Sequence, residues 1–226
     1  MEITYYGHSC FGIKIGSRRL LFDPFIRGNP IATHVDVAAI ETDFILISHA
    51  HGDHLADAED IARRTKATLI SNYEVVTWFN KKGIEGGQSL NHGGKVKLDF
   101  GTVRYVNAIH SSSFPDGTYG GNPGGFVIET AEGNFYYSGD TALTMDMQLV
   151  PMFCKLDFAM LSIGGYFTMD FNDAIIASDF IQCDKIIGMH YDSFPPIKIN
   201  HEEAMAAFKS AGKELTLIKI GESFTI

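Results

Sequence analysis

The sequence predicts a mixed α/β fold in which two β-sheets pack face to face and helices cover their outer faces. Short runs with strand character recur in both halves of the chain, and helix-like stretches separate only some of them. Hydrophobic residues make up 45% of the 226 residues, which is enough for one substantial core. The chain contains no repeat, low-complexity tract or linker, so we expect a single domain over residues 1–226.

The expected strands are short apolar or alternating runs bounded by turn residues. They fall at 2–6, 10–15, 19–22, 43–47, 67–70, 94–100, 102–109, 125–130, 134–138, 157–163, 185–189 and 215–220. Helical periodicity predicts helices over 54–64, 74–82, 172–182 and 201–211. Asn200 and Glu203 have the spacing of a helix-capping pair at the start of the last helix.

Charge and composition limit which partners the protein is expected to bind and in which compartment it is expected to work. The net charge is −9 without a compensating Lys/Arg cluster, which argues against binding to nucleic acid or to an anionic membrane. No apolar stretch approaches the roughly 18 residues that a membrane span needs, and the N-terminus enters a strand pattern at once. Cys10, Cys154 and Cys183 are far apart and lack C-x-x-C spacing, so we expect a cytoplasmic protein without disulfides.

The most informative segment is Ser-His-Ala-His-Gly-Asp-His-Leu at 48–55, which directly follows an apolar run. Imidazole and carboxylate are ligands that zinc, manganese and iron accept, and no cysteine is interleaved. In an extended segment His49 and His51 point to the same side and can hold one ion. Asp53 and His54 begin the next helix and face a second ion. The motif therefore predicts two metal positions that each lack ligands.

The missing ligands are expected where other strands end, because functional residues on β-folds gather at these points. His110, Asp140 and His190 each follow an expected strand directly or within two residues. With these three residues the chain resembles the metallo-β-lactamase superfamily over residues 49–190. The flanking segments resemble its small "metal-dependent hydrolase" branch, which is similar to ascorbate-6-phosphate lactonase and, more distantly, to N-acyl-phosphatidylethanolamine phospholipase D. These segments are 7–11, 21–25, 138–141, 165–169 and 189–192.

The resemblance implies a four-layer αββα sandwich with a dinuclear metal site at one edge of the paired sheets. The first ion would be held by His49, His51 and His110, the second by Asp53, His54 and His190, and Asp140 would bridge them. Zn²⁺ is the favoured metal, with Mn²⁺, Fe and Ni²⁺ as alternatives.

Such a centre favours hydrolysis. Two divalent ions ~3.5–4 Å apart lower the pKa of a bridging water, so that hydroxide becomes the nucleophile, and they polarise the attacked oxygen. Asp53 is then the expected proton acceptor. The expected substrate is a small, anionic ester, lactone or phosphodiester. A nuclease-like phosphodiesterase is disfavoured by size and acidic charge, and an inactive metal-binding scaffold is disfavoured because every ligand position is filled.

Two residues are expected beside the metals. The resemblance places His8, in the turn between the first two strands, close to the site as a catalytic residue that contacts substrate or orients a ligand; the alternative is a turn histidine bonded to backbone. Asp23 is expected to accept a hydrogen bond from a ligand imidazole, and an Asx-turn before Pro24 is the alternative.

Four residues are expected to contact substrate. Ser111 follows a metal ligand directly, although serine runs in loops are commonly just solvated. Tyr166, Thr168 and Met169 are assigned to the pocket by the resemblance, with loop packing as the alternative.

The segment 112–125 is rich in glycine and proline, and we expect a mobile flap whose Phe114 and Tyr119 touch substrate. An irregular surface loop is the alternative. His34, His92 and His201 are expected at the surface. The oligomeric state cannot be read from the sequence, and a homo-oligomer stays open.

Overall fold

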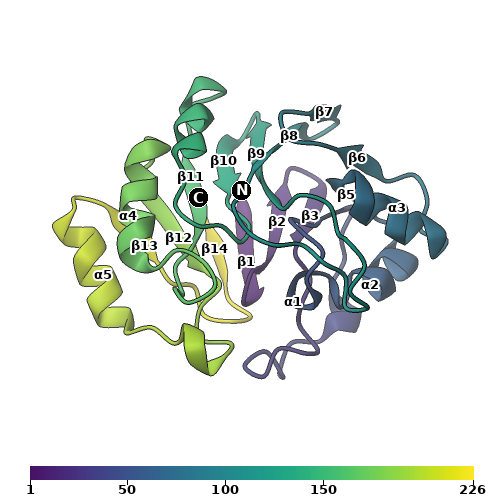
Figure 1. Ribbon diagram of the computed structural model, residues 1–226, viewed down its shortest axis with the longest axis horizontal. Helices are drawn as coiled ribbons and strands as arrows, with labels where there is room; N and C mark the ends of the chain where they lie inside the picture. Colours follow the sequence, from purple (N-terminus) through teal and green to yellow (C-terminus); the bar gives the residue numbers. More distant parts are fainter.

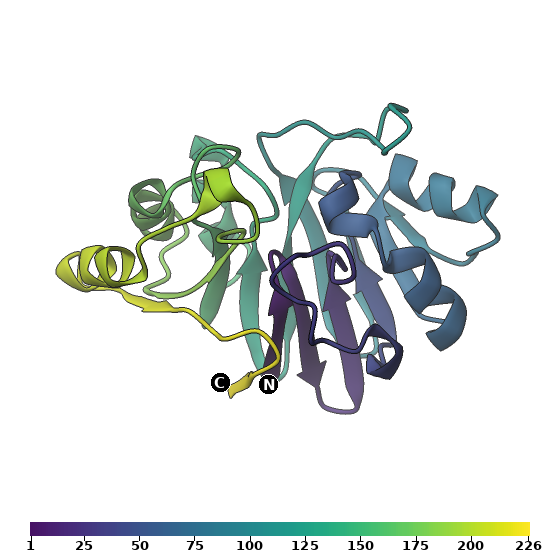
Figure 2. The same ribbon diagram turned by 90° about the horizontal axis from the view of Figure 1, so that it is seen from below.

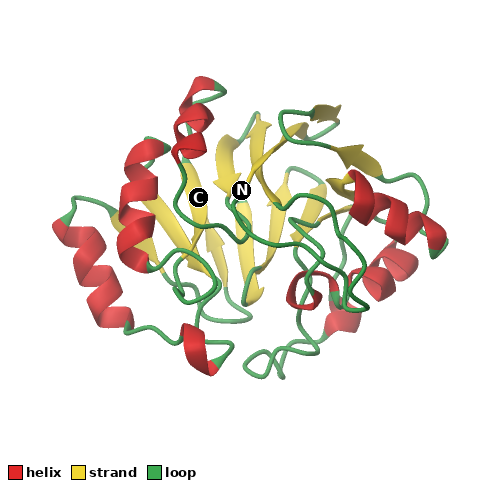
Figure 3. Ribbon diagram, viewed as in Figure 1, coloured by secondary structure: helices red, strands yellow, loops and turns green.

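The computed structural model describes residues 1–226 and confirms the mixed α/β fold with two sheets, each of seven strands (Figure 3). The first sheet contains β1 Glu2–Gly7, β2 Cys10–Ile15, β3 Arg18–Phe22, β4 Phe44–Leu46, β5 Thr68–Asn72, β6 Gln88–Leu90 and β14 Ser223–Thr225. The second contains β7 Lys95–Leu98, β8 Gly101–Asn107, β9 Gly124–Thr130, β10 Gly133–Tyr137, β11 Phe158–Ser162, β12 Lys185–Met189 and β13 Glu214–Thr216.

Helices connect and cover the sheets. They are α1 Gly52–Leu55, α2 Ala58–Thr65, α3 Tyr73–Lys81, α4 Phe171–Phe180 and α5 His201–Ser210, with short 3₁₀ segments η1 Val37–Ala39, η2 Met145–Met152 and η3 Pro195–Ile197. The strand orders are β14-β1-β2-β3-β4-β5-β6 and β13-β12-β11-β10-β9-β8-β7. Helices α1 to α3 lie on the side of the first sheet, and α4 and α5 lie on the side of the second (Figure 1).

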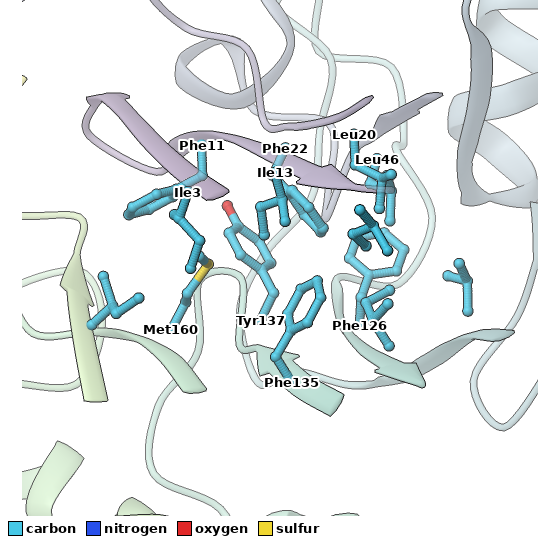
Figure 4. Close-up of a cluster of buried hydrophobic side chains, with 14 of the residues drawn as sticks. Ile3, Phe11, Ile13, Leu20, Phe22, Leu46, Phe126, Phe135, Tyr137 and Met160 are labelled. Atoms are coloured by element: carbon cyan, nitrogen blue, oxygen red, sulfur yellow. The ribbon is translucent and has the colours of Figure 1, made fainter. Parts of the chain in front are cut away.

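Three apolar clusters form between these layers. The central cluster draws on both sheets, where Phe11 and Phe22 face Phe135, Tyr137 and Met160 (Figure 4). A second cluster joins the first sheet to α2 and α3, and a third joins the second sheet to α4 and α5. Each large side chain buried in this way stabilises the fold by roughly 1.5–3 kcal/mol. The layer order is therefore αββα, as the resemblance implied.

Helix α5 begins as expected, because the Asn200 side chain accepts hydrogen bonds from the backbone N–H groups of Glu202 and Glu203. The predicted helix 54–64 is instead two helices, α1 and α2, and this prediction is wrong. The break falls at Asp57, whose carboxylate accepts hydrogen bonds from the backbone N–H groups of Ile26 and Arg27. The side chain thus anchors a distant segment at the point where the two helices meet.

The last expected strand, 215–220, is also different in the structure. It ends at Thr216, and the chain then crosses to the first sheet, where β14 pairs antiparallel with β1. This crossing places both termini side by side (Figure 2), with the Met1 ammonium 3.1 Å from the Ile226 carbonyl oxygen. None of the helices has the length and apolar character required to traverse a bilayer.

The strand directions bring the predicted ligands to one edge. Strands β3, β4 and β5 are parallel, and so are β10, β11 and β12, so the loops that follow them leave from the same end of each sheet. The loop after β4 meets the start of β9 through a hydrogen bond from Gly124 N–H to the Ser48 carbonyl, 3.1 Å long. The His-rich motif therefore lies where the two sheets approach each other.

Candidate metal centre

The first cluster consists of His49, His51 and His110, whose donor atoms all lie within 4.8 Å of one another. His49 Nε2 and His51 Nδ1 are 2.9 Å apart. The His110 ring lies 5.1 Å from the His49 ring and 5.2 Å from the His51 ring, centroid to centroid. His110, which follows His51 by 59 positions, thus meets the two histidines of the motif, as we expected from its place at a strand end.

The second cluster consists of His8, Asp53, His54 and His190, again with donor atoms within 4.8 Å of one another. Asp53 Oδ2 lies 3.3 Å from His8 Nε2, and the His8 and His190 rings are 4.2 Å apart. The sequence predicted that Asp53, His54 and His190 lie together and that His8 lies only near them. The structure puts the His8 ring inside the group.

Asp140 lies between the two clusters. Its Oδ2 atom is 2.9 Å from His190 Nε2, 3.3 Å from His54 Nε2 and 3.6 Å from His110 Nε2. The side chain is 2% exposed. A single carboxylate thus touches a member of each cluster, which is the arrangement that a bridging ligand requires.

Backbone geometry holds these ligands in place. Gly139 has φ of +60°, and a Cβ at this position would lie 2.6 Å from the Gly124 carbonyl oxygen, so the turn before Asp140 needs glycine. His8 and His190 also adopt left-handed conformations, with φ of +56° and +57°. Such conformations cost roughly 1–3 kcal/mol for a non-glycine residue and occur mainly at functional sites.

Asp23 is hydrogen-bonded to residues that adjoin or belong to the two clusters. The carboxylate is fully buried and accepts hydrogen bonds from Ser48 N–H (2.7 Å), Ser48 Oγ (2.6 Å) and Tyr137 Oη (2.7 Å). It also lies 2.8 Å from His54 Nδ1, which confirms the expected bond to a ligand imidazole. Once His54 loses its second proton, the proton that stays on Nδ1 leaves the Nε2 lone pair free for a metal ion. The donor atoms of Asp23, His49 and His54 also lie within 4.8 Å of one another, but the Asp23 oxygens are already engaged in these bonds.

Burial and mutual charge set the protonation of the site. Burial lowers the pKa of His49, His51 and His110, which favours the neutral form that binds metal. Burial would lower the pKa of His54 as well, but the negative charges of Asp140 and Asp23 outweigh it and hold this pKa well above its usual value.

The two carboxylates that face the clusters are anionic at neutral pH. Burial acts to raise the pKa of Asp140, yet the positive charges of His190 and His54 hold it well below its usual range. Burial likewise opposes ionisation of Asp53, and the neighbouring His8 imidazole, 3.3 Å from Asp53 Oδ2, together with the charge of His54 outweighs burial and lowers the pKa. Both groups can therefore serve as charged ligands.

Unpartnered atoms indicate that the site fits metal ions. His8 Nε2, His54 Nε2, His190 Nδ1 and Asp140 Oδ1 are buried and make no hydrogen bond. A buried polar atom without a partner costs about 1–3 kcal/mol, so each one calls for an explanation. Their concentration in one nitrogen- and oxygen-rich group matches the ligand preferences of divalent transition metals.

These protonation states predict a proton balance for metal binding. His54 carries an extra proton in the metal-free protein and must lose it to bind an ion, so metal loading at neutral pH should release protons, and metal affinity should fall as the pH falls. We expect saturating Zn²⁺ or Mn²⁺ to release about one proton per chain more from the wild type than from His54→Gln. A pH indicator in weakly buffered solution measures this release. Equal release from both proteins would contradict the assignment.

The site opens to solvent on the side of the first cluster. His51 and His110 of the first cluster are partly exposed and so is Asp53 of the second, whereas the other side chains of the two clusters are buried. Ser111 is exposed, and its Oγ lies 3.3 Å from His51 Nε2.

The segment 164–170 forms another part of the surroundings. Met169 N–H donates to the Thr141 carbonyl next to Asp140, and Tyr166 is 78% exposed. Thr168 is half-buried, and its hydroxyl donates to the Met169 carbonyl. Met169 is 1% exposed and packs in the third apolar cluster, so the expectation that it lines the pocket is not met; its side chain belongs to the core.

The segment 112–125 is attached to the body at several points. Phe114 is 3% exposed and stacks on Trp78 at 4.1 Å between ring centroids, so its expected contact with substrate is wrong and it anchors the segment instead. Asn72 Nδ2 donates to the Gly120 carbonyl over 2.8 Å. Tyr119 is 61% exposed and is the aromatic side chain of this segment that faces solvent.

Of the three histidines expected at the surface, His34 and His201 are exposed. His92 is half-buried: its ring stacks on Tyr105, 5.4 Å away, and its Nε2 lies 2.9 Å from the Pro123 carbonyl oxygen. The turn pattern around His92 is local, so it could not show that Tyr105 of β8 and Pro123, just before β9, contact this ring.

The two packed sheets and the His/Asp clusters at their edge define a protein of the metallo-β-lactamase type. A sequence profile described as "Beta-lactamase superfamily domain" matches residues 2–190. This chain therefore belongs to the beta-lactamase superfamily, which confirms the resemblance seen in the sequence.

Its relatives include several proteins named "UPF0173 metal-dependent hydrolase". One from Flavobacterium johnsoniae is 56% identical over 226 residues, and one from Methylacidiphilum infernorum is 48% identical over 226 residues; the matches cover 100% of each chain. Among solved structures, the metallo hydrolase Igni18 from the archaeon Ignicoccus hospitalis superposes with a TM-score of 0.89 at 32% identity, covering 100% of this chain and 98% of that one. The relatives are thus metal-dependent hydrolases, the class of enzyme that the sequence predicted.

Proposed function

We propose that this metal-dependent hydrolase works with two divalent ions and cleaves a small anionic ester, lactone or phosphodiester. The first ion would be held by His49, His51 and His110, the second by Asp53, His54 and His190, with Asp140 between them. The observation that carries the proposal is the contact of Asp140 Oδ2 with His110 on one side and with His54 and His190 on the other.

When bound, two such ions would lower the pKa of a water molecule so that it can attack at neutral pH, and would polarise the substrate oxygen. Asp53 is anionic and its side chain is 31% exposed, so it can accept the proton of the attacking water at the open side of the site. His8 Nε2 lies 3.3 Å from Asp53 Oδ2, beside the proposed proton acceptor. Ser111 and Tyr166 are exposed at the site's surroundings and are proposed to contact the substrate, with Thr168 beside them.

The charge of the substrate would be recognised by the ions themselves. Asp23, Asp53 and Asp140 have only histidines as ion-pair partners, so no lysine or arginine is paired with the carboxylates of the centre. A bound pair of divalent cations would then be the strongest positive charge at the opening. This arrangement supports an anionic substrate without a basic side chain to hold it.

Metal content tests this proposal first. Because each position has three protein ligands and shares Asp140, we expect about two ions per chain in protein purified without chelator and reloaded with Zn²⁺ or Mn²⁺. Mass spectrometry of the metal and a substrate panel of lactones, phosphodiesters, phosphomonoesters and thioesters measure the outcome. A stoichiometry that never exceeds about one would contradict the two-metal arrangement.

A further inference from the structure

We propose that His8 is a fourth protein ligand of the second metal position, beside Asp53, His54 and His190. This inference rests on the two-metal function proposed above. The donor atoms of these four side chains lie within 4.8 Å of one another, a spacing that lets all of them reach a single ion.

The unpartnered Nε2 atom of His8 lies among the side chains of Asp53, His54 and His190. His8 is fully buried, its ring lies 4.2 Å from the His190 ring and 5.4 Å from the His54 ring, and its Nε2 atom is 3.3 Å from Asp53 Oδ2. Nevertheless Nε2 makes no aligned hydrogen bond. Because an unpartnered buried nitrogen is unfavourable, its position among three ligands is best explained by a cation that all four share.

The opposite nitrogen of the ring is fixed in the manner of a metal ligand. His8 Nδ1 lies 2.5 Å from Ser193 Oγ. Histidines that bind metal almost always donate the other ring N–H to an outer partner, and this bond sets the tautomer and the ring orientation. If Nδ1–H donates to Ser193 Oγ, then Nε2 carries the lone pair and directs it into the cluster. The reverse tautomer would aim a hydrogen at Asp53, where no aligned bond exists.

The backbone of the first hairpin holds His8 in this place. Its carbonyl oxygen accepts hydrogen bonds from His190 N–H over 2.8 Å and from Tyr5 Oη over 3.0 Å, which ties the turn after β1 to the turn that carries His190. The left-handed φ of +56° is an unfavourable conformation for histidine. A turn that only connected β1 to β2 would be better served by glycine, so the strain is consistent with a need for the imidazole here.

An added ligand changes which metals suit the second position. The four side chains together with Asp140 exceed the four ligands of tetrahedral zinc. We therefore expect the second position to prefer a metal that accepts higher coordination, such as Mn²⁺, Fe²⁺ or Ni²⁺, whereas the three-histidine first position suits Zn²⁺.

Metal affinity of the variant His8→Ala tests the inference. We expect chelator competition to show that the second ion is bound more than about 100-fold more weakly, beyond the ~10–100-fold typical when only an outer partner is lost, while the first ion stays. Ser193→Ala should fall within that outer-partner range. His34→Ala, which removes an exposed imidazole that bonds the Ile220 carbonyl, should bind both ions like the wild type.

Cobalt loading gives a readout independent of activity. Co²⁺ bands in the visible range intensify as coordination number falls, so His8→Ala should show stronger bands than the wild type. If circular dichroism shows that His8→Ala is unfolded, His8→Gln is used instead. The glutamine amide should alter the Co²⁺ spectrum, because an oxygen ligand replaces a nitrogen ligand. A Co²⁺ spectrum identical to that of the wild type, with affinity within about tenfold, would overturn His8 as a ligand.

The same measurements separate this inference from the proposed function. A wild type that binds two ions, with both insensitive to His8→Ala, keeps the two-metal function and removes His8 from the ligand set. A wild type that never binds more than one ion contradicts the two-metal function. The spectrum of that remaining ion then decides the role of His8: a change on His8→Ala supports it, and no change overturns it.

Discussion

Replacing Asp140 by asparagine should remove at least one of the two ions and lower kcat/KM by more than about 100-fold. Asp140 is buried and anionic, and it contacts His54, His110 and His190 within 3.6 Å. The amide of asparagine is neutral, so it leaves the concentrated positive charge of two divalent ions without its compensating carboxylate. Metal analysis by mass spectrometry measures the first effect, and kinetics with the substrate found in the panel measures the second.

The matched control is Asp57→Asn, which also neutralises a buried carboxylate. Asp57 is 2% exposed and binds the backbone of Ile26 and Arg27, so this change should lower stability and leave the metal content unchanged. If Asp140→Asn keeps the wild-type metal content and activity, Asp140 is not part of the centre.

Replacing Asp23 by alanine should have the next largest effect, on both stability and metal binding. The buried carboxylate accepts three hydrogen bonds and is paired with His54. Its loss would leave buried donors unsatisfied and deprive a buried imidazole of its partner, and breaking a buried charged pair of this kind costs about 3–5 kcal/mol. Metal affinity should fall by ~10–100-fold, because the orientation of the His54 ring is no longer fixed.

Urea unfolding of the metal-free protein measures the stability, and chelator competition measures the affinity. Tyr137→Phe is the matched control: it removes the hydroxyl that Asp23 shares with the Ser9 carbonyl, leaves the other bonds to Asp23 in place, and should cost about 0.5–1.5 kcal/mol. An Asp23→Ala protein that unfolds within about 1 kcal/mol of the wild type would refute the supporting role.

Most of the fold could be predicted from the sequence because strand and helix periodicity are local. The predicted strands 2–6, 10–15 and 185–189 agree with the structure to within a residue, since apolar residues mark which face of each strand is buried. By contrast, β6 was missed because it is three residues long, and Leu90 is its one apolar residue. β14 was missed because its pairing depends on a crossing from the other sheet.

Most residues of the candidate metal centre could also be predicted from the sequence. The motif at 49–54 brings four candidate ligands together by spacing, and His110, Asp140 and His190 lie just past strand ends. The parallel strands β10 to β12 bring the loops of Asp140 and His190 to one edge, and β8, two antiparallel steps from β10, brings His110 to the same edge. The membership of His8 in the second group could not be predicted. Its ring reaches the cluster only because the turn after β1 is bonded to the turn of His190, which lies far away in the sequence.

By itself, then, the sequence predicted most of the strands and helices, the superfamily, and seven candidate ligands of the metal centre. Periodicity reports the strands and helices because it depends on neighbours along the chain, whereas the superfamily and the set of seven residues were implied by the resemblance of the motif and its flanking segments. Only the tertiary structure decided that Phe114 and Met169 are buried and that Asp23 bonds His54. Burial and hydrogen bonding of this kind depend on which distant segments pack together, and the identity of a residue alone does not carry that information.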